Sequence, residues 1–419
     1  MSQAEELNQI LRKNNELIYE LLSKKGKAIY FPKQGIIAQS QEARGKEINA
    51  TIGIAIKNDG SPMRLPSIAK RIDLNPKEVF PYASSYGKQE LREKWKEEIY
   101  RKNPSLKEEI SLPVVTSGLT HGLSLVGNLF LDKGEKIIVP DLIWGNYKLI
   151  FEECSGAVLD KFNTFNEEKL DLVAFKEKLS QGEGKKVVLL NFPSNPCGYT
   201  PSKEEVMEIV EIVKERVSAG DKIIIVCDDA YFGLYYEDNL FKESLFSLLS
   251  ELNLLAIKID GASKEMYTWG LRVGFIAYGG KGLVRETLTV LEDKTAGMIR
   301  GSISNVSNLS QSLVLDSLSS VDEKHYQTLK RRFEKVKEVM QTEKYKEYFT
   351  AFPFNSGYFM CLKLKVDAEK VRKVLLKKYN TGVISLPGMI RVSFSCVPVN
   401  DIEKLFENIY NACQEVKNE

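Results

Sequence analysis

Short apolar runs rich in β-branched residues recur between about residues 113 and 320, and amphipathic stretches at helical spacing separate them. Runs of this kind bounded by polar turns are typical of buried strands, and the stretches between them are typical of helices. The alternation predicts βα repeats on a mostly parallel sheet flanked by helices. The predicted strands are residues 113–115, 136–139, 186–190, 222–226, 254–259 and 273–278.

The chain before these repeats has a different pattern. Apolar positions at helical spacing predict an amphipathic helix over residues 3–25, and residues 48–65 predict a short strand with a turn at Asn58–Gly60. Pro66 is expected to open a short helix. A polar loop over 82–87 is then expected before a helix from Lys88 to Tyr100.

After residue 320 the pattern changes again. Helices are predicted over about 321–347 and 367–378, strands at 357–362 and 390–394, and a helix at the end of the chain. A chain of 419 residues exceeds the size at which a single core keeps growing. We therefore predict a large domain over residues 66–325 and a smaller α+β domain that combines residues 1–65 with 326–419.

Composition narrows the classes of function. The chain has 59 basic and 57 acidic residues, so its net charge of +2 gives no reason to expect a nucleic-acid partner or an acidic membrane surface. Acidic residues near the start and the lack of a long apolar stretch argue against a signal peptide or a membrane span, which favours a cytoplasmic protein. Six scattered cysteines and two histidines predict neither disulfides nor a metal site.

Lys264 lies just after the fifth predicted strand, in the stretch Asp260-Gly-Ala-Ser-Lys264. Ligands of α/β sheets bind outside the carboxyl ends of the strands, and an amine held there can condense with a carbonyl. That reaction requires a lowered lysine pKa, which burial or the nearby cation of Arg272 would produce. Taken alone, a Ser-Lys pair is more often an ordinary surface feature.

Polar residues follow the other predicted strands in the same way, and each would suit one part of an aldehyde cofactor that carries a pyridine ring and a phosphate. The helix opened by Gly118-Leu119-Thr120 would suit the phosphate, and Trp144 would stack on the ring. Asp228 would pair with the protonated ring nitrogen. A helix cap, a core tryptophan and a turn aspartate are the ordinary alternatives for these residues.

Four motifs occur in an order and at a spacing that resemble the class I aminotransferases of the pyridoxal-phosphate fold type I, nearest to those for aspartate and aromatic amino acids. The likeness extends from about Ile48 to the C-terminus. The motifs are Asn195-Pro-x-Gly198, Asp228-x-Ala-Tyr231, Ser263-Lys264 and Gly270-x-Arg272-x-Gly274. The resemblance implies a mostly parallel sheet flanked by helices, a smaller α+β domain, and pyridoxal 5'-phosphate as the cofactor.

The resemblance also implies roles for individual residues. Lys264 would form the aldimine with the cofactor and move the proton, Asp228 would hold the ring nitrogen, and Asn195 and Tyr231 would bind the phenolate oxygen. Trp144 would stack on the ring. The residues implied for the phosphate are Gly118, Leu119, Thr120, Ser263 and Arg272, together with Tyr82 from the neighbouring subunit of a homodimer.

The resemblance further implies two substrate-binding arginines. Arg391 matches the arginine that grips the substrate α-carboxylate, with Gly53 near it. Arg300 resembles an arginine that binds a second carboxylate across the dimer, which favours aspartate, glutamate or 2-oxoglutarate as substrates and allows aromatic acids if Arg300 swings aside. Asn195 would contact the substrate as well as the cofactor.

Two positions depart from the pattern of the family. Gly261 stands where many relatives have a phosphate-binding serine, so that phosphate anchoring is expected to be weaker or to shift to Ser263. Tyr147 stands where relatives often have a histidine that orients Asp228, and we expect another group to take over that task.

These implications predict an aminotransferase that moves an amino group from an L-amino acid, namely aspartate, glutamate or an aromatic one, to a 2-oxo acid such as 2-oxoglutarate. The same fold and cofactor also serve C–S lyases, decarboxylases and kynurenine-type aminotransferases, and the residues do not choose among them. A DNA-binding regulator with an aminotransferase-like domain is disfavoured, because only about forty residues precede the resemblance and they contain no basic recognition helix.

Overall fold

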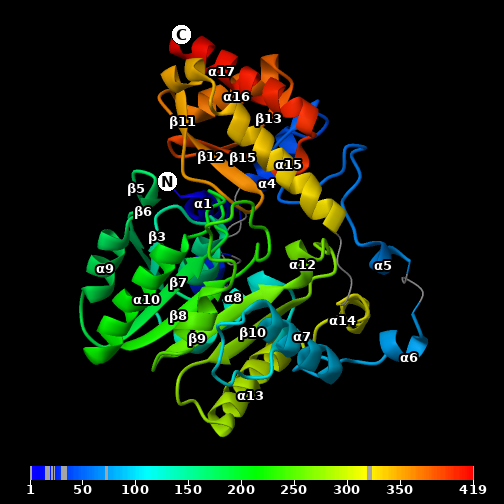
Figure 1. The fold of residues 1–419 in the computed structure, drawn as a ribbon, viewed down its shortest axis with the longest axis vertical. Coiled ribbons are helices and arrows are strands. Elements are labelled where there is room, and N and C mark those ends of the chain that lie inside the picture. Colours follow the sequence, from blue (N-terminus) through cyan, green and yellow to red (C-terminus); the bar gives the residue numbers. More distant parts are fainter. Residues whose placement is uncertain are drawn as a thin grey trace.

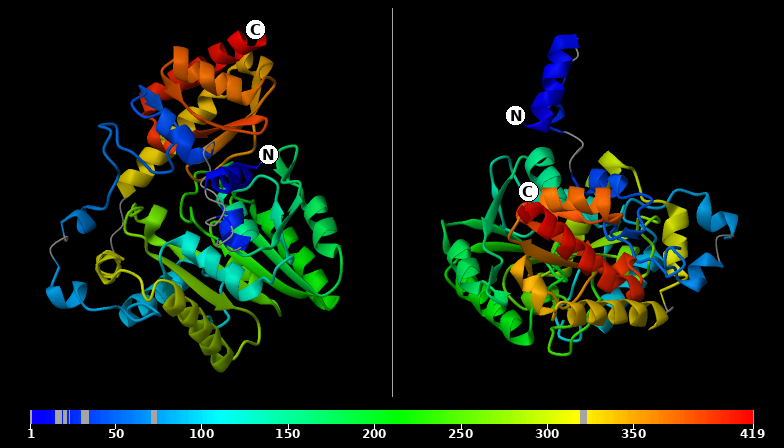
Figure 2. Two further views of the ribbon diagram at one scale, coloured as in Figure 1. Left: turned by 180° about the vertical axis from the view of Figure 1, so that it is seen from behind. Right: turned by 90° about the horizontal axis from the view of Figure 1, so that it is seen from above.

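The computed structural model describes residues 2–14, 19, 22, 24–29, 35–70, 74–318 and 323–418. The first helix of the chain, α1 (Gln3–Asn14), confirms the start of the helix predicted over residues 3–25, and Figure 2 shows it extending away from the rest of the molecule. The remainder of that prediction falls largely on residues 15–18, 20, 21 and 23, which lie outside the described residues. A short helix, α3 (Lys24–Ala28), follows.

The larger part of the molecule is built on a seven-stranded sheet with the strand order β2-β10-β9-β8-β7-β3-β4 (Figure 1). Neighbouring strands run parallel except β10, which is antiparallel to both β2 and β9. The strands are β2 (Val114–Thr116), β3 (Lys136–Pro140), β4 (Val158–Phe162), β7 (Lys185–Asn191), β8 (Lys222–Asp228), β9 (Leu255–Gly261) and β10 (Gly274–Gly279). All six predicted strands are confirmed, as is the mostly parallel sheet.

Alternate residues of these strands pack on opposite faces of the sheet. In β7, Val187 and Leu189 belong to one apolar cluster, whereas Val188 and Leu190 belong to another. Both faces are covered by helices, so the central strands are apolar on both sides. The helices of this part are α7 (Gln89–Lys102), α8 (Leu119–Phe130), α9 (Leu172–Ser180), α10 (Lys203–Ser218), α11 (Leu245–Leu249), α12 (Ala262–Glu265), α13 (Arg285–Ser302) and α14 (Asn308–Leu315).

Several shorter elements complete this part of the chain. A π-helix occupies Lys148–Cys154, between β3 and β4. The strands β5 (Phe165–Asn166) and β6 (Lys169–Leu170) form a separate hairpin. Two short helices, α5 (Pro66–Ala69) and α6 (Pro76–Val79), lie at the periphery of the molecule in Figure 1. As predicted, α5 opens at Pro66, and a loop precedes α7.

The rest of the chain forms a second layer around a four-stranded antiparallel sheet with the order β11-β12-β15-β14. Its strands are β11 (Phe349–Ala351), β12 (Phe359–Leu364), β14 (Ile384–Leu386) and β15 (Met389–Ser393), and its helices are α15 (Glu323–Val339), α16 (Ala368–Lys378) and α17 (Ile402–Asn418). The helix predicted over 321–347 is shorter than expected: α15 ends at Val339, and a 3₁₀ turn occupies Glu343–Glu347. Residues 321 and 322 lie outside the described residues.

Segments from both ends of the chain meet in this second layer. The strand β1 (Ile48–Asn49) pairs in parallel with β13 (Thr381–Gly382), and the side chain of Gln39 in α4 (Ile36–Glu42) bonds to the backbone of Ser385. The helix α4 packs against β13 and β14, and Figure 1 shows it apart from the large sheet. This arrangement supports the predicted smaller domain, although its boundaries at residues 65 and 325 stay a prediction.

The seven-stranded sheet places the polar ends of neighbouring strands at one edge. Asn191 and Asp228 are the last residues of β7 and β8 and lie opposite each other in register, and Asp228 lies opposite Ile259 of β9. The carboxyl ends of parallel strands are where α/β sheets bind ligands. In the described part of the chain, no helix has both the length and the apolar character that crossing a bilayer requires.

Candidate active site

Lys264 projects from α12, a single helical turn that begins directly after β9. The turn is held from three sides: Ala262 N–H donates to the carbonyl of Val273 at 3.3 Å, Thr268 Oγ1 donates to the carbonyl of Ala262 at 2.9 Å, and Tyr358 Oη donates to the carbonyl of Lys264 at 3.4 Å. The lysine amine lies 5.1 Å from the centre of the Tyr231 ring. The backbone around Lys264 is therefore fixed, and its amine faces the Asp228–Tyr231 segment.

The surroundings of Lys264 favour its neutral form. Burial lowers the lysine pKa to about 8, and Arg272 acts in the same direction, whereas the negative charge of Asp228 opposes the shift. A neutral amine is the form that attacks a carbonyl and accepts a proton. At neutral pH a pKa of about 8 leaves most of this amine protonated, but its neutral fraction is far larger than that of an ordinary lysine.

Asp228 is buried at the end of β8, and Tyr147 is its principal partner. Tyr147 Oη donates to Asp228 Oδ2 at 2.5 Å, and the backbone N–H of Ala230 donates to Oδ1 at 3.2 Å. Burial raises the pKa of Asp228, while the Tyr147 hydrogen bond and the charge of Lys264 lower it. The expectation that a group other than Tyr147 orients Asp228 is wrong, because the Tyr147 hydroxyl itself reaches the carboxylate.

Asn195 and Tyr231 are hydrogen-bonded to each other, and Tyr231 is close enough to Asp228 for the two groups to interact electrostatically. The turn that carries Asn195 is fixed by a hydrogen bond from its N–H to Asn191 Oδ1 at 2.8 Å. The Asn195 side chain is hydrogen-bonded to Tyr231, which favours the ionised phenol, but burial dominates and raises the Tyr231 pKa. Both polar groups are therefore neutral hydrogen-bonding groups at neutral pH and face the same space as Lys264.

Arg391 is the most unusual charge in this region, because its side chain is buried at 2 % exposure in β15. Its Nη1 donates to Asn195 Oδ1 at 3.1 Å and its Nη2 to the carbonyl of Thr51 at 3.2 Å, while Nε has no partner. Among the described residues, no acid lies within ion-pair distance of it. A buried guanidinium is costly unless an anion joins it. The site therefore calls for a carboxylate from outside the chain.

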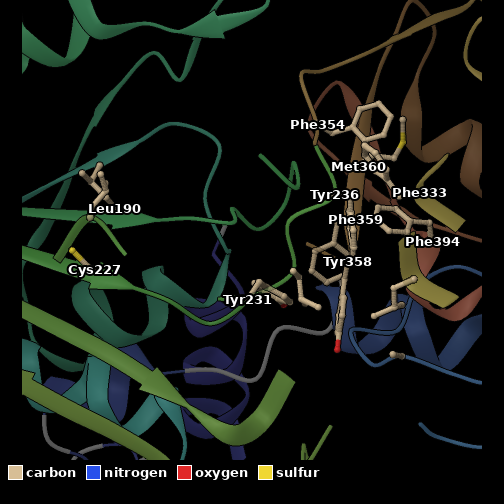
Figure 3. Packing of buried hydrophobic residues seen from close by; sticks show 14 of the residues in the cluster. Leu190, Cys227, Tyr231, Tyr236, Phe333, Phe354, Tyr358, Phe359, Met360 and Phe394 are labelled. Atoms are coloured by element: carbon tan, nitrogen blue, oxygen red, sulfur yellow. The ribbon is translucent and has the colours of Figure 1, made fainter. Parts of the chain in front are cut away.

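The aromatic ring of Phe359 packs against the guanidinium of Arg391. The ring of Phe359 lies 4.3 Å from the guanidinium carbon and 5.5 Å from the Tyr231 ring. In Figure 3, Tyr231 lies toward Tyr358 and Phe359, at the contact between the two layers of the molecule. Gly53 lies beside the same ring, because a Cβ there would be 3.6 Å from Phe359 Cζ.

A close approach of three chain segments forms the opposite end of the site. Gly118 has φ +76° and caps α8, and a Cβ on it would lie 2.3 Å from Nη2 of Arg272. A Cβ on Gly261 would clash with its neighbours, because it would lie 2.8 Å from Leu119 Cδ1 and 2.9 Å from the Cα of Gly274. This packing explains why position 261 is a glycine, since a serine would force these segments apart.

The same end of the site offers donors to an anion. The backbone N–H groups at the start of α8, at Leu119 and Thr120, lack intrahelical acceptors, and the guanidinium of Arg272 lies beside Gly118, the cap of that helix. Ser263 Oγ is buried and has no hydrogen-bond partner. A phosphate with three acceptor oxygens fits donors of this kind, whereas a role of Ser263 in place of the serine absent at 261 stays a prediction.

Three of the site residues predicted from the sequence are more exposed than the residues described above. Trp144 is half-buried, and its ring meets that of Tyr147 edge-on at 5.7 Å. Tyr82 is 93 % exposed, and Arg300 is exposed at the end of α13, where Nη1 donates to Ser304 Oγ at 2.8 Å. The single chain therefore does not bring Tyr82 or Arg300 to the site through any contact.

Sequence reasoning missed three contributors to this geometry: the hydroxyl of Tyr147, the ring of Phe359 and the carbonyl of Thr51. Tyr147 was noticed only as a departure from a pattern. Its spacing of three residues from Trp144 was the available signal, because Tyr147 N–H donates to the Trp144 carbonyl at 3.0 Å and closes a turn. Phe359 and Thr51 gave no signal in the sequence.

The turn that carries Asn195 is joined tightly to the second layer of the molecule. The carbonyl of Gly198 accepts from the N–H groups of Asn355 and Ser356, both at 2.9 Å. Gly198 has φ +71°, and a Cβ on it would lie 2.0 Å from the carbonyl oxygen of Phe359. This Gly198 seam fixes Asn195 relative to the sheet that carries Arg391.

A model of the family described as aminotransferase class I and II matches residues 55–409. The chain belongs to this family. It is therefore a pyridoxal-phosphate-dependent enzyme that transfers nitrogenous groups, which agrees with the resemblance seen in the sequence. The donor set fits this cofactor on independent grounds, because a partly neutral lysine lies between a buried acid and the arginine at the start of α8, and the serine hydroxyl next to it in the sequence has no partner.

Two curated relatives illustrate the likeness in sequence. The probable aspartate/prephenate aminotransferase of Aquifex aeolicus is 27% identical over 354 residues, which cover 80% of this chain and 84% of the relative. The aspartate aminotransferase of Sulfurisphaera tokodaii is 26% identical over 361 residues, covering 82% and 84%.

Solved structures share the fold. An aminotransferase from Anaerococcus prevotii superposes with a TM-score of 0.81 at 24% identity, over 93% of this chain and 98% of that one. An alanine aminotransferase from Pyrococcus furiosus gives a TM-score of 0.76 at 20% identity, over 94% and 100%. At these identities the likeness establishes the fold-type-I architecture and not the substrate.

Proposed function

We propose that this enzyme transfers the amino group of an L-amino acid to a 2-oxo acid, with aspartate or glutamate as favoured donors, aromatic amino acids as further donors, and 2-oxoglutarate as an acceptor. The observation that carries the proposal is the buried guanidinium of Arg391, which has no acid among its described neighbours. The side chain of Asn195 is hydrogen-bonded both to this guanidinium and to the Tyr231 phenol. Every amino acid and every 2-oxo acid brings the α-carboxylate that Arg391 lacks.

The cofactor would be held by groups at both ends of the site. Asp228 would accept the ring N–H, Asn195 and Tyr231 would bond the phenolic oxygen, and Trp144 would cover the ring. The start of α8 at Gly118, with Leu119, Thr120, Ser263 and Arg272, would hold the phosphate. When bound, pyridoxal phosphate supplies an aldehyde that takes up the amino group and a ring that accepts the electrons left on the substrate carbon.

The residues of the chain then have separate tasks. Lys264 would hold the cofactor covalently through its amine, and once the substrate amine has freed it, the neutral amine would serve as the base that takes and moves the proton of the substrate Cα. Asp228, kept ionised by Tyr147, would hold the proton on the ring nitrogen. Arg391 and Asn195 would orient the α-carboxylate so that the Cα proton points to Lys264.

Two further parts of the proposal concern a second copy of the chain. Tyr82 is nearly fully exposed and Arg300 makes its contact with Ser304 only at the protein surface. A homodimer with shared active sites would bring Tyr82 to the phosphate and Arg300 to the distal carboxylate of the substrate. The relatives named for aspartate support this preference for dicarboxylic substrates.

Substitution of the lysine tests the proposal. Lys264→Ala protein should bind the cofactor without covalent attachment, so that borohydride reduction leaves no cofactor mass on the chain, and turnover should fall by about 10⁴-fold or more. Lys281→Ala, which removes an exposed lysine beyond β10, is the matched control and should keep both properties. Normal turnover by Lys264→Ala protein would end the proposal.

A donor panel tests the substrates separately. Aspartate, glutamate, phenylalanine and alanine are supplied with 2-oxoglutarate, and the keto product of each donor is measured. Aspartate and phenylalanine should both yield their 2-oxo acids. Release of pyruvate with ammonia or sulfide, or of carbon dioxide, in place of amino transfer would instead favour a lyase or a decarboxylase on the same fold.

A further inference from the structure

A buried lysine, Lys258, lies on the face of the large sheet that is turned away from Asp228. In the pairing of β8 with β9, Lys258 lies opposite Cys227, one residue before the pair formed by Asp228 and Ile259. Because successive side chains of a strand point to opposite faces, Lys258 and Asp228 lie on different faces. Only 1 % of the surface of Lys258 is exposed. Its charge is therefore enclosed by protein on the side of the sheet opposite Asp228.

Lys258 pairs with two acids at the ends of these strands. Its amine forms an ion pair with Asp229 and lies 3.4 Å from Asp260 Oδ2. Both acids are held by further hydrogen bonds, because Ser244 Oγ donates to Asp229 Oδ2 at 2.6 Å and the N–H of Gly261 donates to Asp260 Oδ1 at 2.8 Å. Lys258 therefore ties the chain that follows β8 to the end of β9.

A second ion pair continues this line of charges to the turn that carries Lys264. Lys102, at the end of α7, lies 2.5 Å from Glu265 Oε1 and also interacts electrostatically with Asp260. The charges along the line alternate in sign, in the order Asp229, Lys258, Asp260, Lys102 and Glu265. The two ends of the line are the residues that directly follow Asp228 and Lys264 in the sequence.

The groups at the centre of the line are charged at neutral pH. Burial lowers the pKa of Lys258, but the charges of Asp229 and Asp260 outweigh burial and raise that pKa above its usual value. Burial raises the pKa of Asp229 to about 6, although the charge of Lys258 opposes the shift. Buried ions are costly, and neutral residues of similar shape often support a fold equally well. Such a line therefore contributes little to stability, but each ion fixes the position of its partner.

We propose that Lys258 is a positioning residue, which sets the spacing between Asp228 and the Lys264 amine by holding the chain at Asp229 and Asp260. The inference rests on the proposed function, in which Lys264 moves the proton of the substrate Cα. A misplacement of about 1 Å can lower a rate by about 10²-fold. Loss of the line should therefore slow proton transfer more than it weakens the binding of the cofactor or the donor.

Two variants and one control test the inference. Lys258→Met keeps most of the length of the side chain and removes its charge. The triple variant Asp229→Asn/Lys258→Met/Asp260→Asn removes all three charges, so it leaves no unpaired buried ion among them and should unfold near the temperature of the wild type. Arg372→Met, which removes another buried cation held between two acids in the second layer, is the matched control.

Hydrogen exchange of the cofactor-free proteins measures the position of the turn without reference to activity. The amides of residues 260–268 should exchange about tenfold faster in the two variants that lack Lys258 than in the wild type and in Arg372→Met protein. With the cofactor bound, kcat for aspartate should fall by about 10- to 100-fold, while KM and the dissociation constant of the cofactor stay within about threefold. The primary deuterium isotope effect with α-deuterated aspartate should rise, because cleavage of the Cα–H bond becomes slower relative to the other steps.

The outcomes separate the inference from the function on which it rests. The inference stands only if hydrogen exchange, kcat and the isotope effect all change in the triple variant and not in Arg372→Met protein. A change in only one or two of them, a loss confined to cofactor affinity, or a triple variant that fails to fold overturns it and leaves the proposed function standing. Normal turnover by Lys264→Ala protein overturns the proposed function itself.

Discussion

The surroundings of Arg391 and of Arg300 differ in almost every physical respect, although the sequence suggested carboxylate binding for both. Arg391 lies within a sheet, on the ring of Phe359 and with two of its nitrogens bonded. Arg300 lies on the last turn of a helix, in solvent, with one hydroxyl as its neighbour. The first site is complete before a ligand arrives, whereas the second exists only if another surface covers it.

The difference shows how one chain can require one carboxylate strictly, at Arg391, and tolerate the absence of a second one, at Arg300. A buried guanidinium without an acid discriminates strongly, because an incoming molecule without a carboxylate leaves it unpaired. An exposed arginine loses little when its partner is absent, since water solvates it. Recognition of the α-carboxylate is therefore expected to be strict, and recognition of the side chain to be tolerant.

Replacement of Arg391 should have the largest effect. Arg391→Ala should lower kcat/KM for every amino donor by about 10²- to 10³-fold, because a buried charge-assisted pair contributes roughly 2–5 kcal/mol. Arg391→Lys should recover only part of the loss, since an ammonium lacks the planar fork. Steady-state kinetics with aspartate and phenylalanine measure this. A loss confined to one donor would show that Arg391 does not bind the group that all donors share.

Replacement of Arg300 should have a smaller and selective effect. Arg300→Ala should lower kcat/KM for aspartate by about ten- to hundredfold, the cost of one charged hydrogen bond, and leave phenylalanine within about threefold. Lys294→Ala, which removes another exposed cation from α13, is the control and should affect neither donor. Equal losses with both donors would remove Arg300 from side-chain recognition and make the two arginines alike.

Removal of the aromatic face under Arg391 should have the smallest effect. Phe359→Leu should raise KM for all donors by about fivefold, because a desolvated cation–π contact contributes roughly 1 kcal/mol. Phe349→Leu, at a buried phenylalanine of β11 in the same sheet, is the control for altered packing. A Phe359→Leu enzyme with unchanged KM would show that hydrogen bonds alone position the guanidinium.

The fold was predictable from the sequence to the extent that apolar periodicity determines it. Each strand buried on both faces, such as β7 and β8, was found, whereas the edge strand β4 (Val158–Phe162) was missed because its pattern mixes exposed and half-buried residues. The reversed direction of β10 was equally invisible, because direction depends on the path of the chain and not on composition. The predicted helix over 321–347 was too long, since a 3₁₀ turn continues its apolar spacing.

The positions of the motif residues near the strand ends were predictable from the sequence, but the side chains that contact them were not. Asp228 and Lys264 were assigned from the ends of the strands that precede them, and the structure turns both toward one space. The contact between Tyr147 and Asp228 joins residues 81 positions apart through the reach of a phenol, which no local pattern encodes. For Arg300 and Tyr82, the structure of a single chain shows no contact with the site, so their roles stay part of the proposal.

The Gly198 seam has a mechanical consequence. A rotation of the four-stranded sheet over the seven-stranded one would be restrained at this seam, because a Cβ-free residue and two short backbone hydrogen bonds join the two layers there. Arg391, bonded to the Asn195 turn, would therefore move little relative to that turn. The guanidinium that awaits a carboxylate would thus keep its position while the rest of the second layer moves.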